Sequence, residues 1–266
     1  MKDFSQTWLE AIGDILVNGE PAAPRGKLTK EIPQRTMVVN MRKPVLMVPS
    51  RSLSYRFMAA EAYWILSGDD TVAGIAPYNS RIAEFSDDGE RFFGAYGPKI
   101  LSQLDYVVAK LKADHDTRQA GLTIWRENPP ATKDVPCTVA LFFSLRGMVL
   151  NAHVFMRSSD VWLGVPYDVF NFSMLAHLVC GRLNDERASN DVYEPGKLYL
   201  TAASSHLYET NWADAKVCLE LGQTRNQPMT PKLLWNDYRG LMDHLKALRD
   251  TSPGHVLRWW EQTDEA

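Results

Sequence analysis

The hydrophobic positions of the chain follow two periods, one typical of helices and one typical of strands. Apolar residues three or four positions apart predict amphipathic helices over residues 4–18, 52–66, 100–111, 171–183 and around 241–248. β-Branched and apolar stretches predict one or two strands over 36–47, interrupted at Lys43-Pro44, a short strand ending at Trp125, and a strand over 197–201. Residues 138–144 and 148–156 predict a hairpin that turns at Arg146-Gly147.

The polar and glycine-rich stretches between these elements predict loops. Residues 21–30 form a basic loop, and Gly164 to Tyr167 are expected to form a turn before the helix at 171–183. Residues 69–97 have little periodicity, and long irregular segments inside compact domains tend to carry function. The chain has no internal repeat and no linker, so a single α+β domain over residues 1–266 is predicted.

Composition excludes several classes of protein. The formal net charge of −3 argues against a general nucleic-acid surface, so a bound phosphate would need local arginines. No apolar run approaches the roughly 18 residues of a membrane span, and the first residues do not resemble a signal peptide. Cys137, Cys180 and Cys218 have neither a disulfide-framework nor a zinc spacing. These features predict a cytoplasmic setting, in a bacterium or an infected host cell, without a nucleic-acid or membrane partner.

Two residues could carry nucleophilic and acid–base chemistry. Cys137 follows Pro136 at the start of a predicted strand, where nearby cations could favour its thiolate. Taken alone, Cys137 fits a buried apolar thiol better, as do Cys180 and Cys218. Glu61 lies in an apolar stretch of a predicted helix, either on an exposed edge, which is commoner, or buried for chemistry.

Other residues could bind an anion or a sugar. Arg157-Ser158-Ser159-Asp160 combines a guanidinium fork with hydroxyl groups, which suits a phosphate or a carboxylate, although such turns also face solvent. His206 and Tyr208 lie two positions apart, so in an extended segment both point to one side and could bind a sugar hydroxyl. The Arg157–Asp160 turn and the His206–Tyr208 pair are each also compatible with an ordinary structural role.

The order of these motifs along the chain resembles the thymidylate synthase family. The resemblance covers residues from about 5 to 225. It is carried by Arg25-Gly26, Glu61 and Trp64 before Gly68-Asp69, Tyr96-Gly97, Thr117-Arg118, Pro136-Cys137, the segment from Arg157 to Tyr167, and His206-Leu207-Tyr208.

This resemblance implies a large twisted mixed sheet flanked by helices, and a homodimer that forms through that sheet. It also implies that each active site borrows Arg118 from the partner subunit. Gln119 occupies a position where the family usually has a second arginine. Arg25, Arg157 and Ser158 would complete the phosphate site, with His206 and Tyr208 at the sugar.

The resemblance further implies a mechanism. The thiolate of Cys137 adds to C6 of a pyrimidine, and C5 then attacks the one-carbon unit of the co-substrate 5,10-methylenetetrahydrofolate. Loss of the C5 proton and of the folate leaves an exocyclic methylene. Glu61 would organise proton transfers and water, and Tyr96 would lie near the C5 proton. The folate would be bound by Asp160 at its pterin, by Arg51 at its tail, and near Gly164 and Ala83.

Asp168 departs from the family pattern, which has an asparagine that reads uracil after the Gly-Leu-Pro-Phe motif. An ionised carboxylate only accepts hydrogen bonds, so it repels O4 of uracil but accepts from the 4-amino group of cytosine. If N3 of cytosine is protonated, Asp168 can pair with both groups, and the wrong base leaves buried polar atoms unpaired. This resembles the aspartate of deoxycytidylate hydroxymethylases.

Two further departures concern water. Ala83 stands where synthases have a tryptophan near the folate, and the chain ends in the polar residues 262–266 where synthases have a short apolar segment. Both changes favour hydration of the methylene over its reduction. The predicted reaction converts dCMP, methylenetetrahydrofolate and water to 5-hydroxymethyl-dCMP and tetrahydrofolate.

Three alternatives remain open at this point. The enzyme could prefer CMP, as related enzymes of nucleoside-antibiotic pathways do. It could instead methylate dUMP or dCMP, or hydroxymethylate dUMP. In a different class, the chain could be a catalytically silent homologue that binds a nucleotide or RNA.

Overall fold

A computed structural model describes residues 3–185, 191–227 and 229–251. Its centre is a 7-stranded mixed sheet in the order β1-β2-β7-β5-β4-β3, with β6 paired to the end of β7. The β5–β7 and β6–β7 pairs are parallel and the others are antiparallel. The strands are β1 (Glu20–Ala22), β2 (Thr29–Asn40), β3 (Gly121–Thr123), β4 (Thr138–Arg146), β5 (Val149–Met156), β6 (Ser159–Asp160) and β7 (Glu194–Tyr208).

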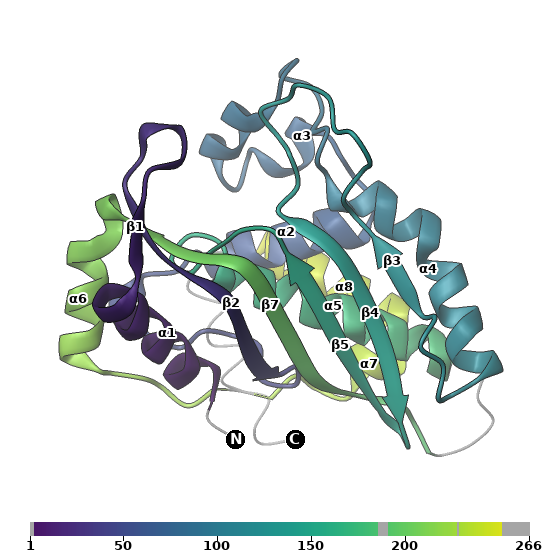
Figure 1. The fold of residues 1–266 in the computed structure, drawn as a ribbon. Coiled ribbons are helices and arrows are strands. Elements are labelled where there is room, and N and C mark those ends of the chain that lie inside the picture. The colour runs from purple at the N-terminus through teal and green to yellow at the C-terminus, as the bar shows by residue number, and fades with distance from the viewer. Residues whose placement is uncertain (1–2, 186–190, 228, 252–266) are drawn as a thin grey trace.

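The helices lie mainly on one face of this sheet (Figure 1). Helix α5 packs against β5 and β7 and also against α2 and α8, so it is apolar around most of its circumference. The helices are α1 (Phe4–Asn18), α2 (Tyr55–Leu66), α3 (Val72–Ile75), α4 (Tyr96–Ala113), α5 (Val165–Asn184), α6 (Trp212–Leu221), α7 (Leu233–Asn236) and α8 (Tyr238–Asp250). Short 3₁₀ turns are η1 (Pro24–Gly26), η2 (Pro49–Arg51), η3 (Ser80–Phe85) and η4 (Glu209–Asn211).

The predicted α+β class and large mixed sheet are confirmed. The predicted hairpin forms as β4 and β5, with Arg146 opposite Val149 and Gly147 at a φ of 58° in the turn. The first helix ends at Asn18 as expected, and Gly68 follows α2 in the left-handed conformation that favours glycine. Cys180 and Cys218 are buried, as their apolar surroundings predicted.

Several boundaries were wrong. The strand predicted over 36–47 is β2, which starts at Thr29 and ends at Asn40, so its first residues fall in the loop predicted over 21–30. Residues 44–47 are buried outside the strands, because the chain turns at Asn40 to Lys43 before the proline. Strand β7 continues to Tyr208, well beyond the predicted end at 201, and helix α6 was not predicted.

Helix α5 begins six residues earlier than predicted. Gly164 to Tyr167 were expected to form a turn, but Val165–Asn184 is one continuous helix with Pro166 in its first turn. Proline is accepted there because the first amides of a helix have no partner within it. Asp168 therefore lies on the first turn of α5.

One face of the sheet carries no helix over β7, β5 and β4 in the described part of the chain (Figure 1). Phe142 and Phe155 pack edge to face there and remain 42% and 44% exposed, which is unusual for large aromatic side chains. His153 and Tyr199 stack beside them. No helix among residues 3–185, 191–227 and 229–251 is long and apolar enough to cross a membrane.

Candidate active site

Cys137 is the last residue before β4 and is partly exposed. Burial raises the pKa of its thiol, while the positive charges of Arg157 and Arg25 act to lower it. Asp168 and Asp134 raise the pKa further. The charges of two cations and two carboxylates therefore act on the thiol in opposite directions, and a bound anionic substrate would change that balance.

Arg157 fixes the backbone that leads to Cys137. Its Nε donates to the carbonyl of Pro136 at 3.0 Å and its Nη2 donates to the carbonyl of Val135 at 2.8 Å. Its backbone amide also donates to the carbonyl of Cys137 at 2.9 Å. Part of the guanidinium predicted to bind phosphate thus positions the cysteine, and the exposed remainder is left for an anion.

The irregular segment 69–97 also supports this backbone. The amide of Gly94 donates to Asp134 Oδ2 at 2.7 Å, and Asp87 accepts from Thr132 and from the amide of Lys133. These contacts join the segment to residues 132–134, just before Cys137. The irregular segment is therefore part of the site's framework.

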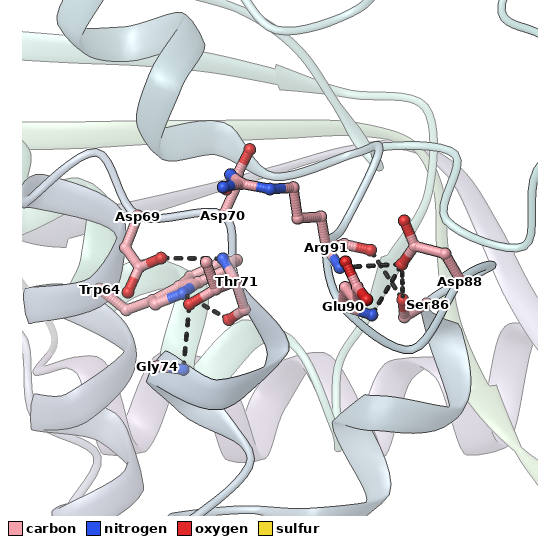
Figure 2. Close-up of polar contacts among 9 residues, drawn as sticks. All are labelled: Trp64, Asp69, Asp70, Thr71, Gly74, Ser86, Asp88, Glu90 and Arg91. Carbon is pink, nitrogen blue, oxygen red and sulfur yellow. Dashed lines mark hydrogen bonds and ion pairs between the residues drawn. The ribbon is translucent and has the colours of Figure 1, made fainter.

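Figure 2 shows how segment 69–97 holds its own shape. Asp88 Oδ1 accepts hydrogen bonds from the hydroxyl of Ser86 at 3.0 Å and from the amides of Glu90 and Arg91 at 2.7 and 2.9 Å. The guanidinium of Arg91 pairs with Asp70. Local side-chain bonds of this kind replace the ladder bonds that a helix or strand would supply.

Tyr96, at the start of α4, reaches the first residue of β4. Its hydroxyl accepts from the amide of Thr138 at 3.2 Å and from the Thr138 hydroxyl at 3.0 Å. The ring stacks on Phe172 of α5. Burial, followed by the charges of Asp168 and Cys137, raises the pKa of Tyr96, so the phenol stays neutral.

Glu61 lies on α2 and faces α5, where Asn171 Nδ2 donates to its Oε2 at 2.7 Å. Burial raises the pKa of Glu61 to about 7, Asn171 acts to lower it, and the charge of Asp168 acts to raise it. Glu61 is half-buried, so it matches neither the exposed nor the fully buried alternative, and its carboxyl group contacts α5. A carboxyl group with this pKa can take up and release protons near neutral pH.

Asp168 shares this environment. Burial, followed by the negative charge of Asp160, raises the pKa of Asp168 to about 7, and no hydrogen bond within the described residues opposes the shift. A Cβ added at Gly164 would lie 3.1 Å from Asp168 Oδ2, so glycine leaves room for the carboxyl group. The carboxyl group is thus held by packing and keeps its hydrogen-bonding capacity.

Asp160 and His206 face each other across the short β6–β7 ladder. Asp160 Oδ1 accepts from the amides of Trp162 and Leu163 at 2.8 and 3.0 Å. Burial raises the pKa of Asp160, and the charges of His206 and Arg51 oppose that rise. The His206 and Tyr208 rings lie 5.2 Å apart, on one side of β7 as predicted.

Arg51 contacts Trp162 through both its backbone carbonyl and its ring. It donates from Nη2 to the carbonyl of Trp162 at 2.8 Å, and its guanidinium carbon lies 4.4 Å from the centre of the Trp162 ring. Its Nε is buried and has no partner within the described residues. Asp160 and Arg51 thus offer an acceptor and a donor near each other, next to an aromatic ring.

Some predicted site residues have no hydrogen bond or ring contact with this cluster within the described residues. Arg25 is exposed in η1 with a φ of 54°, and it reaches Cys137 through its charge. Arg118 is exposed in the connection between α4 and β3, and Ser158 is partly exposed just before β6. Ala83 is partly buried in η3, where its carbonyl accepts from the amide of Ser86. Residues 262–266 lie outside the described residues.

Sequence reasoning missed two residues that contact the site. Asn171 binds Glu61, and Thr138 binds the hydroxyl of Tyr96. Asn171 could have been found, because a polar amide between Phe170 and Phe172 on a buried helix needs a polar partner. Thr138 gave no signal, since threonine is ordinary at the start of a strand.

Comparison with known proteins adds two findings. The sequence model of the family described as "Thymidylate synthase" matches residues 6–247. The match includes α7 and most of α8, beyond the limit near residue 225 that the motifs suggested. A deoxyuridylate hydroxymethyltransferase of Bacillus phage SP01 is 31% identical over an alignment of 229 residues, and the alignment covers 77% of this chain and 57% of that protein. The chain therefore spans little more than half the length of this relative.

Proposed function

Because the chain belongs to the thymidylate synthase family, we propose that it is a cytidylate 5-hydroxymethyltransferase. The proposed reaction joins dCMP, 5,10-methylenetetrahydrofolate and water to give 5-hydroxymethyl-dCMP and tetrahydrofolate. The base assignment is carried by one observation, the half-buried Asp168, whose charge acts on Cys137, Tyr96 and Glu61. The name of the phage relative supports the hydroxymethyl outcome, because it describes a hydroxymethyltransferase.

Cys137 is the proposed nucleophile. Its thiolate adds to C6 of the pyrimidine, which moves an electron pair to C5 and makes that carbon nucleophilic. Arg157 and Arg25 already act to lower the pKa of the thiol. They are also proposed, with Ser158, to bind the phosphate, while His206 and Tyr208 bind the sugar.

Asp168 is proposed to read the base. As a carboxylate it accepts from the 4-amino group of cytosine, and from N3 when that nitrogen carries a proton. A carboxylate facing O4 of uracil would place two acceptors together without a hydrogen between them. Negative charge on Asp168 therefore favours cytosine over uracil.

Glu61 and Tyr96 are proposed to manage protons around C5. The pKa of about 7 suits Glu61 to act as a base in one step and an acid in another. The raised pKa of Tyr96 keeps its hydroxyl protonated, so it can relay a hydrogen bond without carrying charge. Both residues are half-buried, which reduces the access of bulk water to the reacting carbon.

The residues near Trp162 suit the proposed co-substrate, which supplies the one-carbon unit. The carboxylate of Asp160 can accept from a pterin ring, and the unpartnered Nε of Arg51 remains available when the side chain moves to meet a carboxylate. Gly164 and Ala83 are proposed to line the same region. Ala83 leaves out the indole ring expected in synthases, which supports entry of water to the methylene.

We further propose that the enzyme is a homodimer and that Arg118 acts in the partner's site. Arg118 is exposed, and no contact within the described residues ties it to Cys137 of its own chain. The bare sheet face with Phe142 and Phe155 is apolar enough to be covered by a second copy.

Hydroxymethylation of dUMP is the second candidate. It is favoured by the pKa of Asp168, about 7, because a protonated carboxyl group presents a donor to O4 as an asparagine does. The name of the phage relative also refers to deoxyuridylate. CMP is the third substrate to compare, since a 2′-hydroxyl alters only the sugar contacts.

A product assay tests the proposal. Enzyme and methylenetetrahydrofolate are incubated with dCMP, CMP or dUMP, and the products are analysed by mass spectrometry. We expect 5-hydroxymethyl-dCMP as the main product, and no tritium release from 5-tritiated dCMP by Cys137→Ala. A 5-methyl product, or dihydrofolate formed in step with turnover, would refute hydration. Preference for dUMP would refute the base assignment.

A further inference from the structure

Asn171 is a buried polar residue that the proposed mechanism does not yet use. It lies one turn after Asp168 on α5, and the residue is only 5% exposed. Its Nδ2 donates to Glu61 Oε2 at 2.7 Å, whereas its Oδ1 is buried and has no hydrogen-bond partner within the described residues. Buried acceptors without a partner are uncommon, and those that occur need an explanation.

A protonated Glu61 carries the hydrogen that Asn171 Oδ1 lacks. An amide presents a donor and an acceptor side by side, and a carboxylic acid presents the complementary acceptor and donor. When Glu61 is ionised, only the bond from Nδ2 can form. When Glu61 is protonated, a second bond from its hydroxyl to Asn171 Oδ1 becomes possible.

We propose that Asn171 is a positioning residue for Glu61, holding its carboxyl group through the amide nitrogen in the ionised state and through both amide atoms in the protonated state. The inference rests on the proposed function, in which Glu61 transfers protons. It gives Glu61 one orientation in both protonation states, so that no rotation is needed between its two roles.

No other ionisable group on the helices packed against α2 is placed to hold the Glu61 carboxyl group in the described residues. From α5, Asp168 and Tyr167 are the ionisable groups that interact with Glu61, and neither brings a positive charge. From α4, Tyr96 is a neutral phenol. Helix α3 has no ionisable residue. From α8, Arg249 lies over the ring of Tyr63, and neither it nor His244 is among the groups that shift the pKa of Glu61.

The hydration step shows what the second hydrogen bond contributes. A C–O bond forms between water and the exocyclic methylene, and the proton lost by the water goes to the Glu61 carboxylate. The electron pair of the methylene double bond moves into the ring, and the Cys137–C6 bond breaks to release the thiolate. Glu61 is then protonated, so Asn171 Oδ1 gains its partner as the reaction proceeds. Such an interaction assists the chemical step more than substrate binding.

Two variants of Asn171 and one matched control test the proposal. Asn171→Leu removes both polar amide atoms and keeps the same branched shape with four heavy atoms, and Asn171→Ser keeps a smaller group that can donate and accept. Asn184→Leu makes the same change in another buried asparagine of α5, whose amide binds Tyr193 and Trp235 away from the site. Each variant is measured for thermal melting, tritium release from 5-tritiated dCMP, and kcat and KM across pH 5.5–9.

For Asn171→Leu, we expect kcat to fall by about tenfold or more with KM for dCMP almost unchanged. The bond from Nδ2 to the carboxylate is charge-assisted and acts to lower the pKa of Glu61, whereas both bonds to the protonated carboxyl group join neutral partners. Its loss should therefore move the rising limb of the kcat profile to higher pH by roughly one unit. Asn171→Ser should retain part of the activity, and the rising limb of its kcat profile should lie between those of wild type and Asn171→Leu. Asn184→Leu should lower the melting temperature and leave the rising limb at the wild-type pH.

The proposal would be overturned if the rising limb of the kcat profile stayed at the wild-type pH in both Asn171 variants. It would also be overturned if activity fell only in proportion to the melting temperature, as expected for Asn184→Leu. If Asn171→Leu does not fold, Asn171→Ser carries the comparison. Failure of the proposed function has a different signature, because wild-type enzyme would then give no hydroxymethyl product. Tritium release would still report on Cys137 and Glu61 in that case, so the effect of Asn171 on proton transfer at C5 could still be measured.

Discussion

Asp168 combines two properties that usually exclude each other, a position on the first turn of a helix and a raised pKa. A helix N-terminus favours a negative charge, yet burial and the charge of Asp160 raise the pKa of Asp168 to about 7. Its protonation state therefore changes within the range in which the enzyme can be assayed. This makes pH a test of how the base is read.

We predict that the preference for dCMP over dUMP increases with pH. Below pH 7 the protonated carboxyl group can donate to O4 of uracil, whereas above pH 7 the carboxylate can only accept. The ratio of kcat/KM for the two nucleotides, measured from pH 5.5 to 8.5, should therefore rise through about pH 7. Asp168→Asn should favour dUMP and give a ratio that hardly depends on pH. A flat ratio in the wild-type enzyme would contradict this account.

The same raised pKa predicts that the site lowers the stability of the fold at high pH. Asp168 and Glu61 each have a higher pKa in the folded state than in the unfolded state. Their contribution to stability is therefore fully present below about pH 4, and it is lost as the pH rises through about 7. At pH 8, Asp168→Asn should thus be more stable than wild type by up to roughly 4 kcal/mol, since the pKa is raised by about three units. The gain should shrink towards pH 5.

Chemical denaturation at pH 5 and pH 8 measures this difference. The exposed residue Asp243 on α8 provides the control, because Asp243→Asn should leave the free energy of unfolding almost unchanged at both values. Equal stability of Asp168→Asn and wild type at pH 8 would mean that the Asp168 carboxylate is better solvated than its packing suggests.

At the scale of elements, periodicity found most helices and the hairpin but missed where several of them begin. Helix α5 starts at Val165, because a proline in the first turn costs no hydrogen bond, although it interrupts the hydrophobic pattern. Strand β2 starts at Thr29 within a polar stretch, since pairing with β7 supplies its hydrogen bonds. Tertiary contacts determined these boundaries, and local sequence does not report them.

The sequence likewise predicted the main residues of the candidate site but not the contacts that hold them. The order of motifs identified Cys137, Glu61 and Asp168, which the structure brings into one cluster through shared electrostatic effects. The Asn171–Glu61 bond could not be derived, because it joins helices 110 positions apart in the sequence. The part that Arg157 plays in holding the loop before Cys137 was hidden for the same reason, since its contacts are to backbone carbonyls.

We predict that the segment 86–94 depends on Asp88 for its shape. Asp88→Ala removes the acceptor shared by Ser86, Glu90 and Arg91, so residues 86–94 should be cut faster by a protease. Asp88→Asn keeps one oxygen acceptor and should be cut at a rate closer to wild type. Because Gly94 binds Asp134 near Cys137, kcat should fall in Asp88→Ala while the melting temperature changes little. Equal cleavage of all three proteins would contradict the prediction.

At the scale of the whole molecule, the sheet is one-sided. Helices cover the face that contains the core, and the other face presents Phe142 and Phe155 over strands that carry no helix in the described residues (Figure 1). A patch of exposed aromatic side chains indicates an interaction site. A second copy of the chain is the proposed occupant, because the proposed phosphate site lacks an arginine that Arg118 of a partner could supply.

Shared active sites can be tested by mixing two inactive variants. Cys137→Ala lacks the nucleophile and Arg118→Ala lacks the proposed donated arginine, so each homodimer should have little activity. In a mixed dimer, one site would combine an intact Cys137 with an intact Arg118 from the other chain. After unfolding and refolding an equal mixture, about a quarter of wild-type activity should return, because half of the dimers are mixed and each has one complete site.

Arg239→Ala, at an exposed arginine on α8, should be active alone and serves as the control. If the mixture stays inactive although sedimentation shows mixed dimers, Arg118 acts within its own chain or not at all, and the phosphate site must be completed by Arg25 and Arg157.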